Sequence, residues 1–158
     1  LQSLERGERQ LPLTSFLLGR GQTALARDEL ITALIVRRHQ GYQRYTQVGP
    51  RAALVYPTVA TALVLDRSTQ WLALGIANAA ETAIRAEAAE AVAIAAIPWD
   101  ENELPHGLAQ RFGEQAAEAC SPSDDQQASA AYRRHAVSVM ARRLLEDAFN
   151  ATSPNHSS

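Results

Sequence analysis

The side chains of this sequence that could do chemistry are few and lie far apart. None of the histidines occurs in an H-E-x-x-H or similar ligand spacing, so we expect no metal site. Those histidines are His39, His106, His135 and His156. No serine lies in a G-x-S-x-G sequence, which excludes the nucleophile elbow of α/β hydrolases. All 15 basic residues are arginine, so Schiff-base and P-loop lysines are excluded, and the residues alone predict no catalytic group.

Three smaller clusters have a structural explanation beside a chemical one. We expect Cys120, the single cysteine, to be buried and inert, because the nearby acidic residue Glu118 would raise its pKa. Asp124 and Asp125 precede a predicted helix, which favours capping of that helix over acid/base work. The sequence Tyr132-Arg133-Arg134-His135 predicts an aromatic anchor whose arginines pair with these aspartates, and a ligand site is the alternative.

The composition of the 158-residue chain indicates a folded domain. Hydrophobic residues make up 46% and charged residues 20%, which argues against disorder. The net charge of −2 gives no positive field for nucleic acid. The longest apolar run, residues 91–97, is far shorter than the ~20 residues that span a bilayer. We therefore expect a cytoplasmic protein without a nucleic-acid or membrane partner, and the start at Leu1 rather than Met suggests a piece of a longer polypeptide.

The elements that must position any site begin with strands. Apolar, β-branched residues predict a strand at 30–36, and alternation predicts a second at 42–48. Residues 58–65 and 71–77 flank the polar sequence 66–69 and predict a hairpin.

Helical patterns follow the strands. The alanine-dense residues 87–96 predict a helix that stops before Pro98. A D-x-x-E sequence from Asp100 predicts a capped helix to about residue 119, and a long helix is expected at about 127–149. Strands first and helices second predict an α+β fold, an antiparallel three- to four-stranded sheet covered by three helices.

Several segments, taken in order, resemble one known domain. Residues 8–16, 21–25 and 28–31 are similar to an R-x-v-P-L-x-x-F … G-x-T-x-L … x-E-L-I opening, and residues 47–52 to K-V-G-x-R-x-A. Residues 74–86 and 122–135 are similar to L-G-G-V-…-P-…-R-A and P-x-D-D-x-x-A-S-x-x-Y-R-R-x. These patterns are typical of the C-terminal domain of the FAD-binding (medium) subunit of molybdenum hydroxylases, the xanthine dehydrogenase and aerobic CO dehydrogenase flavoprotein family.

The resemblance implies a role in flavin binding. In that family the subunit holds FAD, which passes electrons from a [2Fe–2S] cluster on a small subunit to NAD⁺ or another acceptor, while a large molybdopterin subunit oxidises the substrate. The resemblance assigns flavin contacts to Ile31, the residue after E-L, and to Gln47, which stands where the family has lysine. Most FAD contacts belong to two upstream domains, so we expect the isolated chain to be inactive and not to retain FAD.

Two interpretations stay open at this point. In the first, residues 1–25 are a linker or the end of a preceding FAD-binding domain, 26–151 form the flavoprotein C-terminal domain, and 152–158 are a disordered tail. In the second, the chain is a freestanding, non-catalytic interaction module of the same fold that has lost flavin binding. The glutamine at position 47 in place of lysine favours the second interpretation, and the start at Leu1 with the intact opening motif favours the first more strongly. The sequence does not identify the substrate, because its pocket would belong to another subunit.

Overall fold

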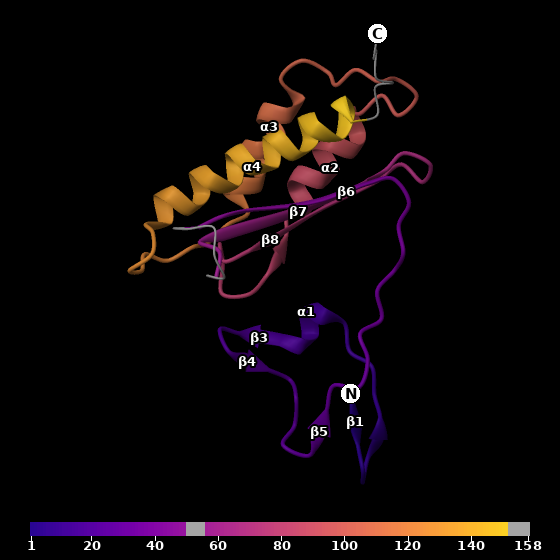
Figure 1. Ribbon diagram of the computed structural model, residues 1–158, viewed down its shortest axis with the longest axis vertical. Coiled ribbons are helices and arrows are strands. Elements are labelled where there is room, and N and C mark those ends of the chain that lie inside the picture. The colour runs from indigo at the N-terminus through magenta and orange to yellow at the C-terminus, as the bar shows by residue number, and fades with distance from the viewer. Residues whose placement is uncertain (50–55, 152–158) are drawn as a thin grey trace. The chain divides into compact units, whose positions relative to one another are not determined.

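The computed structural model describes residues 1–49 and 56–151, which divide into two compact units, Leu1–Arg38 and His39–Ser158 (Figure 1). The division follows Arg38, whereas the sequence interpretation ends its first segment at residue 25, and the functional boundaries stay a prediction. The expected disordered tail, residues 152–158, lies outside the described residues.

The first unit is built from very short strands. Strands β1 (Gln2–Ser3), β2 (Gly7–Glu8) and β5 (Glu29–Leu30) form an antiparallel sheet in the order β2-β1-β5. Helix α1 (Leu13–Phe16) leads into β3 (Leu17–Gly19), which pairs with β4 (Gln22–Thr23).

The strand predicted at residues 30–36 is wrong beyond Leu30, where β5 ends. A strand requires a neighbouring strand for its backbone hydrogen bonds, and the described residues of this unit provide none alongside residues 31–36. Leu34, Ile35 and Val36 are accordingly 79–83% exposed. The β-branched residues have the right propensity, but within the described part of this unit no strand pairs with them.

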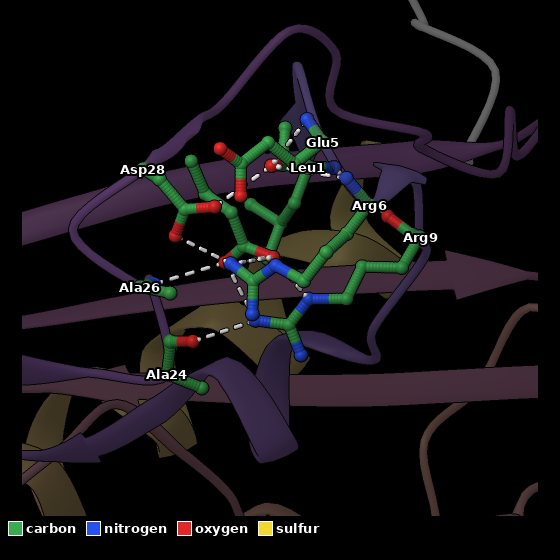
Figure 2. A network of polar contacts seen from close by, with 9 residues as sticks. Leu1, Glu5, Arg6, Arg9, Ala24, Ala26 and Asp28 are labelled. Carbon is green, nitrogen blue, oxygen red and sulfur yellow. Dashed lines mark hydrogen bonds and ion pairs between the residues drawn. The ribbon is translucent and has the colours of Figure 1, made fainter.

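A network of ion pairs holds the first unit together (Figure 2). The Arg9 guanidinium binds both carboxylate oxygens of buried Glu29, at 2.6 and 2.7 Å. Arg6 binds Asp28 at 2.5 Å, and the Ser3 hydroxyl donates to the other oxygen of that carboxylate. A bidentate arginine–carboxylate pair fixes two backbone segments in one geometry, so this network joins the start of the chain to β5.

The second unit contains a four-stranded antiparallel sheet. Its strands are β6 (Tyr42–Val48), β7 (Val59–Asp66), β8 (Trp71–Ala77) and β9 (Ile84–Arg85), in the order β6-β7-β8-β9. The predicted strand at 42–48 and the hairpin of β7 and β8 are confirmed. At the hairpin turn the carboxylate of buried Asp66 accepts hydrogen bonds from Ser68 and Thr69, which closes the turn.

Three helices cover one face of this sheet (Figure 1). They are α2 (Glu87–Ala96), α3 (Leu108–Glu118) and α4 (Ala130–Asn150). The predicted α+β fold, an antiparallel sheet of three to four strands covered by three helices, is therefore confirmed.

The start predicted for the middle helix is wrong. Helix α3 begins at Leu108 rather than near Asp100, after Gly107 with a left-handed φ of 75°. Pro105 disfavours helical backbone at the residue before it, so the D-x-x-E sequence cannot begin a continuous helix. Helix α4 begins at Ala130, close to the start predicted at about residue 127. The Ser129 hydroxyl caps this helix, because it accepts a hydrogen bond from the Tyr132 amide at 3.1 Å.

The sheet register separates a core face from an open face. Leu63 pairs with Leu74, and Leu65 with Leu72, so these side chains lie on the same face as their partners and are buried under the helices. Alternate residues point the other way. We call these the open face of the sheet: Gln43, Tyr45 and Gln47 on β6; Ala60, Ala62 and Val64 on β7; and Ala73, Gly75 and Ala77 on β8.

Candidate functional site

The two residues assigned to flavin contact lie in different units of the chain. Ile31 follows β5 in the first unit and Gln47 lies near the end of β6 in the second. Ile31 is 51% exposed and Gln47 is exposed, so each is available to a ligand or to another part of a larger protein. The two residues therefore belong to two surfaces, one on each unit.

Ile31 belongs to an apolar pocket of the first unit. The pocket has a volume of about 550 Å³, and its walls include Pro12, Leu13 and Phe16 together with the extended residues 31–36. Because most of these side chains are hydrophobic, the pocket favours an apolar group over a charged one.

Gln47 projects from the open face of β6, which is one of the two edge strands of the four-stranded sheet. Its carboxamide oxygen Oε1 accepts a 2.7 Å hydrogen bond from the hydroxyl of Tyr45, two residues earlier on the same face. Within residues 1–49 and 56–151, no group accepts a hydrogen bond from its Nε2. The amide is thus available as a hydrogen-bond donor.

Small residues extend across the sheet beside these two polar side chains. Tyr45 on β6 pairs with Ala62 on β7, which in turn pairs with Gly75 on β8. Gln47 pairs in the same way with Ala60, which pairs with Ala77. A Cβ added at Gly75 would meet no atom closer than the Ala62 carbonyl oxygen at 3.9 Å, so the surface there is uncrowded. Ala62 is exposed and Gly75 and Ala77 are half-buried, so a planar group could rest on these small residues, whereas Ala60 beside Gln47 is buried.

An aromatic stack lies at the end of the four-stranded sheet opposite to Gln47. The rings of His39 and Trp71 are parallel within 2°, with centroids 4.0 Å apart, and the Arg85 guanidinium lies 5.8 Å from the Trp71 ring. The imidazole is thus packed against an indole, which explains its position without a ligand. Across the described residues, no three His, Cys, Asp or Glu side chains come together as a metal site.

The arginine-rich start of α4 differs from its prediction. Tyr132 is 46% exposed, so the predicted aromatic anchor is wrong. The buried residue is Arg133, 4% exposed, whose guanidinium donates to the carbonyl oxygens of Thr58 and Asn78. It also binds both carboxylate oxygens of Asp125, at 2.6 and 2.7 Å, which confirms the predicted arginine–aspartate pairing.

The two aspartates cap the backbone before α4. Asp124 accepts from the Ala130 amide at 2.5 Å, and Asp125 accepts from the amides of Gln127 and Ala128. These backbone hydrogen bonds, followed by the one from Arg133, lower the pKa of Asp125. The prediction of capping is confirmed, and the carboxylates are committed to the fold.

Cys120 is buried, and its thiol donates to the Ala116 carbonyl oxygen at 3.3 Å. Burial raises the pKa of this thiol to about 11. The expectation of a buried cysteine with a raised pKa is confirmed, although the cause is burial rather than a neighbouring acid. At neutral pH the group is a thiol and not a nucleophilic thiolate.

Sequence reasoning missed Tyr45 as a partner of Gln47. The signal was present, because strand alternation places residues 45 and 47 on the same face. Family resemblance alone points to position 47, and resemblance carries no information on which side chain contacts its amide.

No helix in the described part of the chain is long and apolar enough to cross a membrane. A family model described as the CO dehydrogenase flavoprotein C-terminal domain matches residues 44–148. This range includes Gln47 and begins after Ile31. None of the curated proteins compared with this chain matches it.

Solved structures resemble almost the whole chain. Carbon monoxide dehydrogenase from Hydrogenophaga pseudoflava, in a form lacking the Mo-pyranopterin moiety, is 25% identical with a TM-score of 0.73, over 91% of this chain and 50% of that one. Reconstituted CO dehydrogenase from Oligotropha carboxidovorans is 26% identical with a TM-score of 0.69, over 86% and 47%. Quinoline 2-oxidoreductase from Pseudomonas putida 86, at 19% identity, shares the fold with a TM-score of 0.72, over 94% and 50%. The chain thus spans about half the length of the solved chains that it matches.

Proposed function

This chain belongs to the CO dehydrogenase flavoprotein C-terminal domain family, and from that premise we propose that it helps to enclose FAD in the flavoprotein subunit of a xanthine dehydrogenase-like molybdenum hydroxylase. The observation that carries the proposal is the family match over residues 44–148, which coincides with the four-stranded sheet and its three helices. The likeness to CO dehydrogenase chains over 86–91% of this chain supports it.

Each of the two exposed residues, taken within its own unit, carries a group that suits a flavin. An isoalloxazine ring is planar, has apolar faces and carries carbonyl oxygens and nitrogens on its pyrimidine edge. Ile31 offers an apolar contact, and Gln47 offers amide N–H donors beside a surface of small residues. When bound, FAD supplies the transfer of one or two electrons, and the protein supplies orientation and hydrogen bonds.

The rest of the cofactor would be held by other parts of the subunit. A pyrophosphate is bound by clustered backbone N–H groups, usually in a glycine-rich loop at a helix N-terminus. This sequence has no G-x-G-x-x-G pattern. We propose that two further FAD-binding domains supply that cradle, and that residues 1–25 connect to them while 26–151 form the C-terminal domain.

The partners follow from the same proposal. A [2Fe–2S] subunit would deliver electrons to the flavin, a molybdopterin subunit would oxidise the substrate, and NAD⁺ or another acceptor would take electrons from the flavin. The chain has no lysine at position 47, so a neutral amide rather than a cation would face the reduced ring.

Flavin content in the complete subunit tests the proposal. We expect the 158-residue chain alone to elute colourless from gel filtration in the presence of FAD, and the complete subunit that contains this domain to retain it. Gln47→Ala and Ile31→Ala in the complete subunit should each weaken FAD retention. The matched control is Gln43→Ala, on the same strand and face.

A complete protein that binds no flavin would refute the proposal and favour the freestanding interaction module. Stoichiometric FAD on the isolated chain would also contradict it, because the cradle would then lie within these residues.

A further inference from the structure

The Tyr45 hydroxyl holds the Gln47 amide in one orientation. The two residues lie two positions apart on β6 and therefore point to the same, open face. The hydroxyl donates to Oε1 at 2.7 Å. Tyr45 is 58% exposed, so its ring leaves the core and its hydroxyl is directed along the surface to Gln47.

This contact decides what the amide can offer to a ligand. A carboxamide carries an acceptor oxygen and a donor NH₂ of nearly equal size, and a freely rotating glutamine presents either one. The hydroxyl takes one of the two lone pairs of Oε1 and turns this oxygen toward Tyr45, so the Nε2 hydrogens point away from Tyr45, and no described residue accepts from them. The pair is therefore a directed hydrogen-bond donor.

We propose that Tyr45 is a positioning residue that makes Gln47 a donor toward the acceptor atoms on the pyrimidine edge of the flavin. The inference rests on the proposed function, since it assumes that Gln47 faces the flavin. That edge gains electron density on reduction, so a fixed donor there stabilises the reduced ring more than the oxidised one. Tyr45 acts on the flavin only through Gln47.

The positioning step is tested first in the 158-residue chain without flavin. Removing the hydroxyl in Tyr45→Phe should shift the side-chain amide ¹H and ¹⁵N resonances of Gln47. The resonances of Gln43 should stay unchanged, because its Nε2 donates to the His39 carbonyl oxygen instead. Unchanged Gln47 resonances would overturn the inference.

The effect on the flavin is tested by a double-mutant cycle in the complete, FAD-loaded subunit. The readout is the equilibrium constant for two-electron reduction against a reference dye. Gln47→Ala should lower this constant about tenfold, the size expected for one net hydrogen bond, which corresponds to ~30 mV. Tyr45→Phe should lower it about threefold, since the donor remains but its orientation is lost. Gln47→Glu should lower it at least as far as Gln47→Ala, because a carboxylate has no N–H to donate.

Adding Tyr45→Phe to the Gln47→Lys variant separates a positioning role of Tyr45 from a direct effect of Tyr45 on the flavin. An ammonium group has three donors and needs no orientation by a hydroxyl, so Tyr45→Phe should leave the constant unchanged there. An equal threefold loss in that background would show that Tyr45 acts directly and would overturn the inference. An unchanged constant in FAD-loaded Gln47→Ala would instead refute the flavin contact of the proposed function. A loss in Gln47→Ala with none in Tyr45→Phe would overturn the positioning role alone.

Discussion

Replacing Arg133 by methionine should destabilise the second unit more than any other change of a single charged side chain at the start of α4. The guanidinium joins that helix to the residues flanking β7 and β8, through the Thr58 and Asn78 carbonyl oxygens at 2.5 and 2.9 Å. Methionine preserves most of the buried volume, so the loss of hydrogen bonds dominates over the loss of packing.

The magnitude follows from the two carbonyl oxygens. A hydrogen bond from a charged donor contributes about 1.5–3 kcal/mol, and buried acceptors left without a donor keep their desolvation cost. Asp125 is 30% exposed at its side chain and can be hydrated, so the loss of its ion pair adds little. Two bonds give a loss of about 3 kcal/mol in the free energy of unfolding.

Urea denaturation followed by tryptophan fluorescence measures this loss. The two tryptophans, Trp71 and Trp99, both lie in the second unit, so the signal reports on that unit. With a slope of about 1.5 kcal/mol/M, the midpoint should fall by about 2 M. The matched control is Arg134→Met, whose side chain is exposed and whose nearest carbonyl is 3.5 Å away, and it should cost under about 1 kcal/mol. Equal losses in the two variants would refute the reasoning.

Three further predictions follow from other contacts. Gly113→Ala should lower the melting temperature through a loss of about 1–3 kcal/mol, because its Cβ would lie within 3.0 Å of the Ser138 carbonyl oxygen between α3 and α4. Arg9 lowers the pKa of Glu29 from 4.5 to about 2, so the first unit should lose stability as the pH falls from 4.5 to 2, seen in the Ala26 amide resonance. Cys120, with its pKa raised to about 11, should react with a disulfide reagent at neutral pH only as fast as the unit unfolds.

Each of these predictions has a control. Gly75→Ala should be nearly neutral, because nothing lies within 3.4 Å of its added Cβ, and an equal effect would contradict the close approach at Gly113. The sign for Glu29 is that of a depressed carboxyl pKa: the stabilisation is complete above 4.5 and absent below about 2, and Glu29→Gln should abolish this dependence. Rapid labelling of Cys120 in native buffer would contradict its burial.

Strand alternation and alanine-dense sequence were enough to predict three of the four strands and the three helices of the second unit, but not the short strand β9 or the start of α3. Residues 42–48 alternate along an edge strand, and β7 and β8 carry hydrophobic residues that the register places under the helices. The strand expected at 30–36 could not be predicted correctly from propensity, because a strand exists only with a neighbour to bond.

The start of α4 shows a different limit of pattern reading. Arg133 lies four residues before Val137, on the stripe that enters the core, yet a charged residue is normally assigned to solvent. Its burial depends on three acceptors, two of them in segments 55 and 75 residues away along the chain. The spacing of residues along the helix does not show that these distant acceptors meet Arg133. Position 47 is assigned by resemblance alone and stays a prediction, whereas the placement of Tyr45 on the same face follows from alternation.

The measurement that tests the central claim most directly is the reduction potential of FAD in the complete subunit with Gln47→Lys. At ~4 Å and an effective dielectric constant of about 20, a cation beside the reduced ring gains ~4 kcal/mol before screening. Solvent and salt leave part of that, and ~1.4 kcal/mol corresponds to about 30 mV for two electrons. Spectroelectrochemical titration should therefore show a potential raised by tens of millivolts. An unchanged potential in a variant that still carries full FAD would show that position 47 does not face the flavin.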